Sequence, residues 1–186
     1  MRESLENHLG KFVYGAIDGT VTTFAVVAAA FGAGLNPGLV IILGVANLLG
    51  DGFSMGSSAY LAAKSERDLA KKRGTYHSKH SVRMKPGETP FINGLITFAA
   101  FVAIGSLTIL SYVAEVIFNL GISPQTLFVI SMVLTGLTFI GVGWLRAKVV
   151  NNNPVWEAIE TLLLGSVAAV LAYLSGDFLA KLLGVN

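Results

Sequence analysis

The sequence contains no cysteine, and only 13% of its residues are charged. The lack of cysteine excludes disulfides, thiolate metal sites, iron–sulfur clusters and cysteine nucleophiles. Soluble domains carry about a quarter charged residues, so the low charge argues against a soluble globular protein. Disorder is excluded as well, because disordered chains combine low hydrophobicity with high charge. Hydrophobic residues occupy 53% of the 186 positions, and the composition therefore indicates a membrane protein.

The sequence is dominated by long apolar stretches. A membrane-spanning helix needs about 20 mostly apolar residues, and five stretches qualify: approximately 12–34, 38–63, 91–118, 127–145 and 155–174. The strands of a membrane β-barrel would be about half as long and would alternate in polarity. We therefore predict an all-α, polytopic membrane protein with one transmembrane domain of five helices and a basic loop at 64–90.

The basic residues are distributed unevenly over the two sides of this topology. Twelve of the 13 Lys and Arg residues lie in the N-terminus, the 64–90 loop and the connection between the last two helices, and only Lys181 lies on the opposite side. Basic residues favour the cytoplasmic side of a membrane. The N-terminus and the 64–90 loop are thus expected in the cytoplasm, in the inner membrane if the chain is prokaryotic.

Two carboxylates, Asp18 and Asp51, lie within predicted spans. An ionisable group there is expensive and marks function by default. Neither Lys nor Arg lies mid-membrane, so the counter-charge must be a proton, a water-lined cavity or a bound cation. A structural alternative is a protonated Asp that bonds another helix or caps a helix break at the neighbouring glycines. Three further acids near the ends of spans are expected to be solvated: Glu115, Glu157 and Glu160.

The second span carries a polar ladder, since Asn47, Asp51 and Met55 recur every fourth residue and share one face. With the flanking lysines at the membrane edge, the helical rise puts Asp18 about 10 Å deep and Met55 about 13 Å deep. Asp18 and Met55 are therefore expected at similar depth on adjacent helices, with Thr22 one turn beyond Asp18. A thioether beside carboxylate and amide oxygens favours a transition metal over Ca²⁺ or Mg²⁺. The alternative for a methionine here is core packing.

Small residues recur at four-residue spacing on both of these spans. Such spacing lets helix backbones approach closely, either within a bundle or across a dimer, and the spacing does not decide between the two. The pairs are Gly15 and Gly19, Gly52 and Gly56, and Ala59 and Ala63.

Two runs of sequence resemble a known family. IDGTVTTFAVV at 17–27 is similar to the first helix of the vacuolar iron transporters, and GVANLLGDGFSM at 44–55, continued by YLAAKSE at 60–66, is similar to the second. The last three spans match that family in hydropathy and placement. Two long motifs in the right order make the resemblance specific.

The resemblance implies a five-helix protomer, a homodimer, and export of Fe²⁺ or Mn²⁺ from the cytosol driven by inward proton flow. It implies that Asp18 and Met55 line the metal path, with Asn47 at a position where some members carry Glu. The family's long, glutamate-rich cytosolic metal-binding domain has no counterpart here. Glu66, which matches the family's Lys-Ser-Glu run, is one of only three acids in the 64–90 loop.

The 64–90 loop permits more than one reading. Residues 66–73 are expected to continue the second helix into the cytosol, and the basic residues after them to face anionic lipid headgroups. His77 and His80, three residues apart, would bind a metal only on a helix, and Gly74 argues against one. No nucleic-acid partner is predicted, because the loop has no aromatic platform or known binding motif.

We therefore expect a proton-coupled exporter of a divalent transition metal. The alternative is a non-transporting accessory or scaffold protein of the membrane that has lost the metal-binding domain. An enzyme is not expected, because the sequence shows no His cluster, no serine nucleophile motif and no phosphate-binding loop. No cofactor is predicted beyond the transported ion, and Asp18, Asn47, Asp51, Met55 and Glu66 are the candidate metal ligands.

Overall fold

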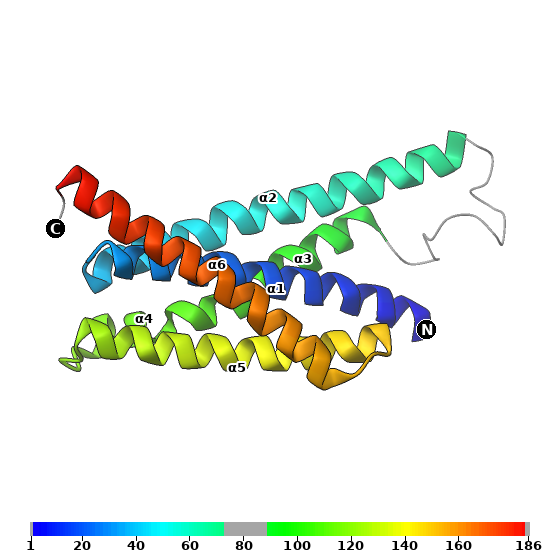
Figure 1. The fold of residues 1–186 in the computed structure, drawn as a ribbon. Helices are drawn as coiled ribbons and strands as arrows, with labels where there is room; N and C mark the ends of the chain where they lie inside the picture. Colours follow the sequence, from blue (N-terminus) through cyan, green and yellow to red (C-terminus); the bar gives the residue numbers. More distant parts are fainter. Residues whose placement is uncertain (1, 73–88, 185–186) are drawn as a thin grey trace.

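Five membrane-spanning segments build the protein, and the computed structural model describes residues 2–72 and 89–184, with side chains from residue 8 onward. These described residues contain helices and no strand (Figure 1). The helices are α1 (Arg2–Gly32), α2 (Pro37–Lys72), α3 (Pro90–Gly105), the 3-10 helix η1 (Ser106–Ile109), α4 (Leu110–Phe118), α5 (Pro124–Val150) and α6 (Pro154–Leu183). The predicted all-α fold with five spans is confirmed.

Several helices are longer than the apolar stretches that predicted them. The second helix continues beyond residue 63 to Lys72, as predicted for residues 66–73, and the last continues to Leu183, beyond its expected end near residue 174. Hydropathy marks the part of a helix inside the bilayer, and a helix does not need to end where it enters water. Residues 73–88, which include His77 and His80, lie outside the described part of the chain.

Three connections end in the same way, with a polar cap followed by proline. The side chains of Thr89, Ser123 and Asn153 each accept a hydrogen bond from a backbone N–H of the following first turn, at 3.3, 3.3 and 2.9 Å. Proline comes next in each case, where its missing N–H would be unpaired in any helix. The same residues that interrupt the hydrophobic pattern therefore start α3, α5 and α6.

The third span is interrupted, which hydropathy did not predict. η1 separates α3 from α4, and the Ser106 and Thr108 hydroxyls donate to backbone carbonyls three residues earlier, at 2.9 and 2.8 Å. Such local side-chain bonds compete with regular helix geometry. Two further hydroxyls fasten this region to α5: Ser111 donates to the Leu127 carbonyl at 3.1 Å, and Ser131 donates to the Thr108 carbonyl at 2.5 Å.

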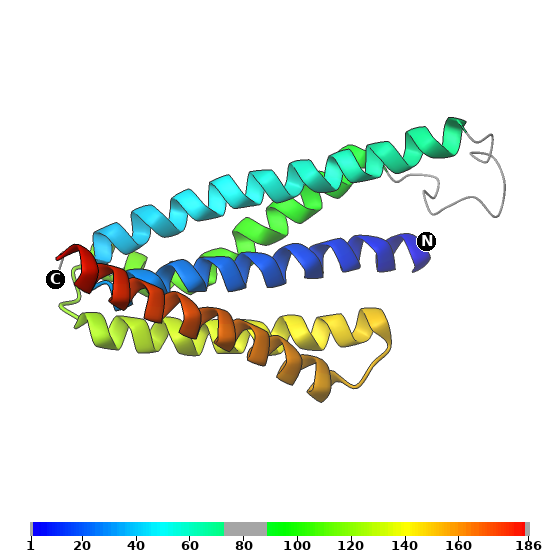
Figure 2. The ribbon, with the colours of Figure 1, turned by 45° about the horizontal axis from the view of Figure 1, so that its top comes forward.

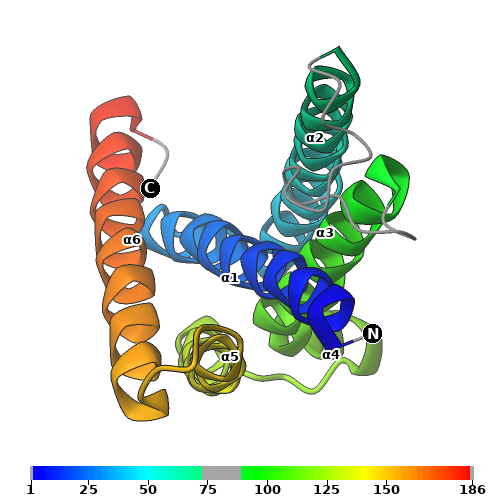
Figure 3. The same cartoon turned by 90° about the vertical axis from the view of Figure 1, so that its right-hand side faces the viewer.

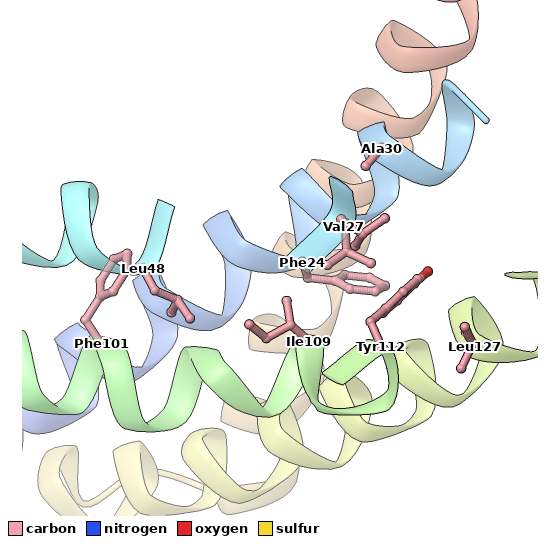
Figure 4. Close-up of a cluster of buried hydrophobic side chains, with 9 residues drawn as sticks. Phe24, Val27, Ala30, Leu48, Phe101, Ile109, Tyr112 and Leu127 are labelled. Atoms are coloured by element: carbon pink, nitrogen blue, oxygen red, sulfur yellow. The ribbon is translucent and has the colours of Figure 1, made fainter. Parts of the chain in front are cut away.

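α1 occupies the centre of the protomer. It contacts α2, α3, α5 and α6, and the end-on view shows α2 and α6 diverging on either side of it (Figure 3). The main buried cluster joins apolar side chains of α1, α2, α3, η1, α4 and α5 around Phe24 (Figure 4). Its members are Phe24, Val27, Ala30, Val40, Leu48, Phe101, Ile109, Tyr112 and Leu127.

The paired glycines of the first two spans pack inside the protomer. A Cβ placed on Gly15 or Gly19 would lie 2.5 Å from a backbone carbonyl oxygen of α3, and one on Gly56 would lie 2.9 Å from the Gly94 carbonyl oxygen. No real Cβ comes so close, so these glycines permit α1 and α2 to approach α3. Of the two readings left open by the spacing, the structure supports packing within the bundle at these positions.

The helix ends that carry basic residues meet at one end of the bundle. Figures 1 and 2 show the N-terminus, the end of α2 and the connection from α5 to α6 at that end, and the C-terminus at the other. Lys181 lies in the last turn of α6. The arrangement agrees with the sidedness on which the topology prediction depends.

Candidate metal pathway between α1 and α2

The polar ladder joins α1 and α2 through the Asn47 side chain. Its amide nitrogen donates to the Thr23 hydroxyl at 3.2 Å and to the Thr22 hydroxyl at 3.4 Å. The Thr22 hydroxyl in turn donates to the Asp18 backbone carbonyl at 2.9 Å. Because the nitrogen of Asn47 is used between the helices, its carbonyl oxygen is the atom available as a ligand.

This contact fixes the register of the two helices. One turn toward the cytoplasmic end from Thr22 and Asn47, the antiparallel pair reaches Asp18 and Asp51, and the two carboxylates are close enough to interact electrostatically. Met55 lies one further turn along α2. Asp18 and Met55, which were expected at similar depth, are therefore offset by about one turn. Both helices continue beyond the lysines taken as the membrane edge, but the Asn47 contact shows that Lys11 and Lys64 do not lie at the same depth.

The two carboxylates differ in burial but share a lack of partners. Asp18 is half-buried, whereas Asp51 is exposed on the protomer. Among the described residues, no cation and no N–H donor bonds either carboxylate. Two adjacent anions without a counter-charge, in the part of the chain that spans the membrane, would need a cation or protons to balance them.

Met55 lies near this pair of carboxylates, whereas Glu66 lies far from it along α2. Met55 is half-buried and packs against the main hydrophobic cluster, so its thioether borders both the core and the ladder. Glu66 is exposed on the extension of α2, about 16 Å along the helix from Met55. The structure therefore brings four of the five candidate ligands together and leaves Glu66 apart. Among the described residues, no three His, Asp or Glu side chains lie close enough together to hold a metal ion.

A row of small residues borders the ladder and faces out of the protomer. These residues recur every fourth position on α2, all are exposed, and we call them the small-residue face: Ala46, Gly50, Ser54, Ser58 and Ala62. A Cβ on Gly50 would meet nothing within 4 Å. Sequence analysis missed this row because it singled out the glycine pairs, whose period is the same but whose face is buried.

Comparison of the sequence with known proteins shows the family to which the chain belongs. The model of the VIT family matches residues 9–85 and 74–177, which together cover most of the chain. The chain belongs to the VIT family. Curated relatives include the "Vacuolar iron transporter" of Toxoplasma gondii, 26% identical over 94% of this chain and 75% of its own length, and that of Plasmodium berghei, 24% identical over 94% and 83%. "Vacuolar iron transporter 1" of Oryza sativa is 25% identical over 87% and 81%.

This VIT-family chain is shorter than the relatives that it matches. The alignments with the T. gondii and P. berghei proteins run over 226 positions, more than the 186 residues of this chain, so those relatives carry insertions. The two matches to the VIT model overlap at 74–85, between α2 and α3.

The acids at the ends of the spans have structural partners in this VIT protein. Glu157 is 3% exposed, its carboxylate lies 3.0 Å from Arg146, and it accepts a hydrogen bond from Asn152 at 2.8 Å. The expectation that it is solvated is wrong, because Arg146 and the Asn-rich turn enclose it. Glu160 lies 3.0 Å from the same arginine. Glu115 accepts two backbone N–H bonds, both 3.1 Å, in the connection after α4.

Proposed function

We propose that this protein exports Fe²⁺ from the cytosol across its membrane in exchange for protons. The observation that carries the proposal is the pair Asp18 and Asp51, two adjacent carboxylates in membrane-spanning helices with no cation bonded to them among the described residues. Membership of the VIT family and the names of the relatives support iron as the substrate.

The chemistry of the exchange follows from the charge of the pair. A divalent cation on two carboxylates gives a neutral site, and two protons on the same carboxylates also give a neutral site. Metal and protons therefore compete for the same oxygens, and a proton gradient directed inward displaces the metal on the outer side. No other charge needs to move through the low-dielectric interior, where it would be costly.

The neighbours of the pair set the preference for the ion and its route. The Met55 thioether, one turn toward the cytoplasmic end, favours Fe²⁺ over the harder ions Ca²⁺ and Mg²⁺. The Asn47 carbonyl oxygen and the Thr22 hydroxyl continue the ladder one turn beyond the pair. An ion entering from the cytosol thus meets Met55, then Asp18 and Asp51, then Asn47.

A homodimer is part of the proposal. Asp51 and the small-residue face point out of the protomer, and polar groups turned toward lipid are unfavourable. Small residues let a second helix approach closely. A second copy seated on α2 would cover the ladder and enclose a hydrated path, which α1 and α2 of one protomer leave open on one side. The excess of basic residues at the N-terminal end puts that end in the cytoplasm.

Transport into proteoliposomes tests the proposal directly. With the protein reconstituted and a proton gradient imposed, Fe²⁺ should cross the membrane faster than with the gradient collapsed by a protonophore. Mn²⁺ added in excess should compete, while Ca²⁺ and Mg²⁺ should not. Equal Fe²⁺ flux in protein-free and protein-containing vesicles would contradict transport.

The accessory-protein alternative has one observation in its favour. The Asn47 amide, at a position where some relatives carry Glu, is occupied in bridging α1 and α2, which is a structural role. The vesicle experiment separates the two functions, because a scaffold protein gives no gradient-dependent flux at any metal concentration.

A further inference from the structure

An apolar groove runs along the outer flank of α2, on the side away from the metal ladder. It has a volume of about 430 Å³ and lies between α2 and α3, which pack side by side (Figures 1 and 2). Its walls are largely aromatic, and its floor is the close contact of Gly56 with Gly94. The lining residues are Phe53, Gly56, Ser57, Tyr60, Phe91, Gly94, Leu95 and Phe98.

A second, basic hollow continues the groove at the cytoplasmic end. It measures about 400 Å³ and shares Tyr60 and Phe91 with the groove. Three cations and one acid line it: Lys64, Arg67, Lys71 and Asp68. Thr89 and Pro90 also line it, so the partly positive N-terminus of α3 adds to the excess of positive charge.

Arg67 carries a buried hydrogen-bond donor that has no partner among the described residues of the hollow. Its Nε is buried and has no hydrogen-bond partner within the described residues. A buried donor without a partner costs free energy comparable to a lost hydrogen bond. An anionic oxygen in the hollow would satisfy it, and arginine binds phosphate with paired N–H bonds.

The dimensions of the two hollows match one leaflet of a bilayer. Along α2, the distance from Lys64 to Phe53 is about 16 Å on the helical rise. Half of a hydrocarbon core of about 30 Å is about 15 Å. A molecule with its anionic group between Lys64 and Arg67 and an apolar chain reaching Phe53 would therefore have the length of a phospholipid in one leaflet.

We propose that the hollow and the groove together bind one anionic phospholipid of the cytoplasmic leaflet. Its phosphate lies between Lys64, Arg67 and the first turn of α3, and one acyl chain lies in the groove against Phe98 and Leu95. This is a defined site on α2 and α3, distinct from a general attraction of the basic loop to the membrane surface. It does not depend on the proposed transport.

Lipid binding to the purified full-length protein in detergent tests the site. Native mass spectrometry should show phosphatidylglycerol bound at least about tenfold more tightly than phosphatidylcholine. Each basic residue beside a headgroup contributes about fivefold in affinity, so the double variant Lys64→Gln/Arg67→Gln should weaken phosphatidylglycerol binding by about 30-fold. Lys72→Gln is the matched control, because Lys72 is exposed on the same helix but lies outside the hollow.

Two further measurements test whether the groove holds an acyl chain and whether the anionic group is a lipid headgroup or free phosphate. Leu95→Trp should fill the groove and weaken both lipids, while the lipid-free unfolding temperature shows that the variant folds. Inorganic phosphate should not displace phosphatidylglycerol, because it lacks the acyl chain. Equal binding of the two lipids, an unchanged preference in the double variant, or displacement by phosphate would each overturn the proposal.

Discussion

Asp18 and Glu157 show two ways in which this chain holds a carboxylate in a helix of the bundle. Glu157 is enclosed and paired with Arg146, so its charge is balanced by the protein. Among the described residues, the charged group that acts on Asp18 is another carboxylate, Asp51. The first arrangement stabilises the fold, and the second leaves a charge that a metal ion or protons must balance.

Neutralising the carboxylate pair should therefore remove transport. Asp18→Asn takes away an anionic ligand and a proton acceptor at once, and we expect Fe²⁺ flux in proteoliposomes to fall to near the background. Asp51→Asn should also reduce flux strongly, because the site then binds a divalent ion with one charge unbalanced. Asp177→Asn, a carboxylate near the opposite end that pairs with Lys181, serves as the control. Wild-type flux in Asp18→Asn would contradict the proposed site.

Met55→Leu should separate metal preference from folding. The change keeps the side-chain volume and removes the sulfur, and apolar replacements of similar volume usually cost less than about 1.5 kcal/mol. The unfolding temperature should stay close to that of the wild type, while Fe²⁺ flux falls severalfold. A variant that transports Fe²⁺ at the wild-type rate would assign Met55 to the core alone.

Glu157→Gln should destabilise the protein far more than Glu160→Gln. Both carboxylates contact Arg146, but the Glu157 side chain is 4% exposed and the Glu160 side chain is 45% exposed. Breaking a fully buried pair costs about 3 to 5 kcal/mol, and the loss here is smaller because the Arg146 side chain is 32% exposed. An exposed pair contributes less than about 1 kcal/mol. Unfolding in mixed detergent micelles would measure both, and equal losses would show that burial does not decide the effect.

At the scale of elements, the close approach of α1 to α3 depends on glycine. Gly19→Ala would put a Cβ 2.5 Å from the Phe101 carbonyl oxygen, so the helices must separate, and we expect a loss of about 1 to 3 kcal/mol in the free energy of unfolding. Gly136→Ala on α5 is the matched control, since its Cβ meets nothing within 4 Å and Gly136 lies outside the small-residue face. An unfolding free energy unchanged in Gly19→Ala would mean that α1 and α3 pack less tightly than described.

The elements show what the sequence can and cannot predict. Five spans were predictable because continuous apolar runs have one main solution in a bilayer. The break at η1 was not, because it depends on hydroxyls such as Ser131 that bond across helices. The ligands on α1 and α2 were predictable from spacing and resemblance, but their register was not. The flanking lysines were a poor guide to the register because they lie at different depths, and here the Asn47 contact with Thr22 and Thr23 sets it.

At the scale of the whole molecule, the proposed homodimer places a second copy over the open side of the ladder. Gly50→Leu places a large side chain on the small-residue face, and we expect it to lower the proportion of dimer at least tenfold while the protomer stays folded. Gly141→Leu on α5 is the control, because Gly141 is also exposed and has nothing within 4 Å of its Cβ position. The mass of the protein–detergent particle measured by light scattering reports the result. An unchanged dimer in Gly50→Leu would move the interface away from α2.

The crowding of basic residues at one end of the bundle has a consequence for the kinetics of the substrate. A divalent cation approaching that end does so against a positive potential, so its encounter rate is lower than diffusion alone would give. Added salt weakens this repulsion: at 0.1 M ionic strength, charges more than about 10 Å apart are largely screened from each other. If Fe²⁺ enters from this side as proposed, we expect its capture rate to rise with ionic strength, opposite in sign to the behaviour of a carrier whose entrance is lined by acidic residues.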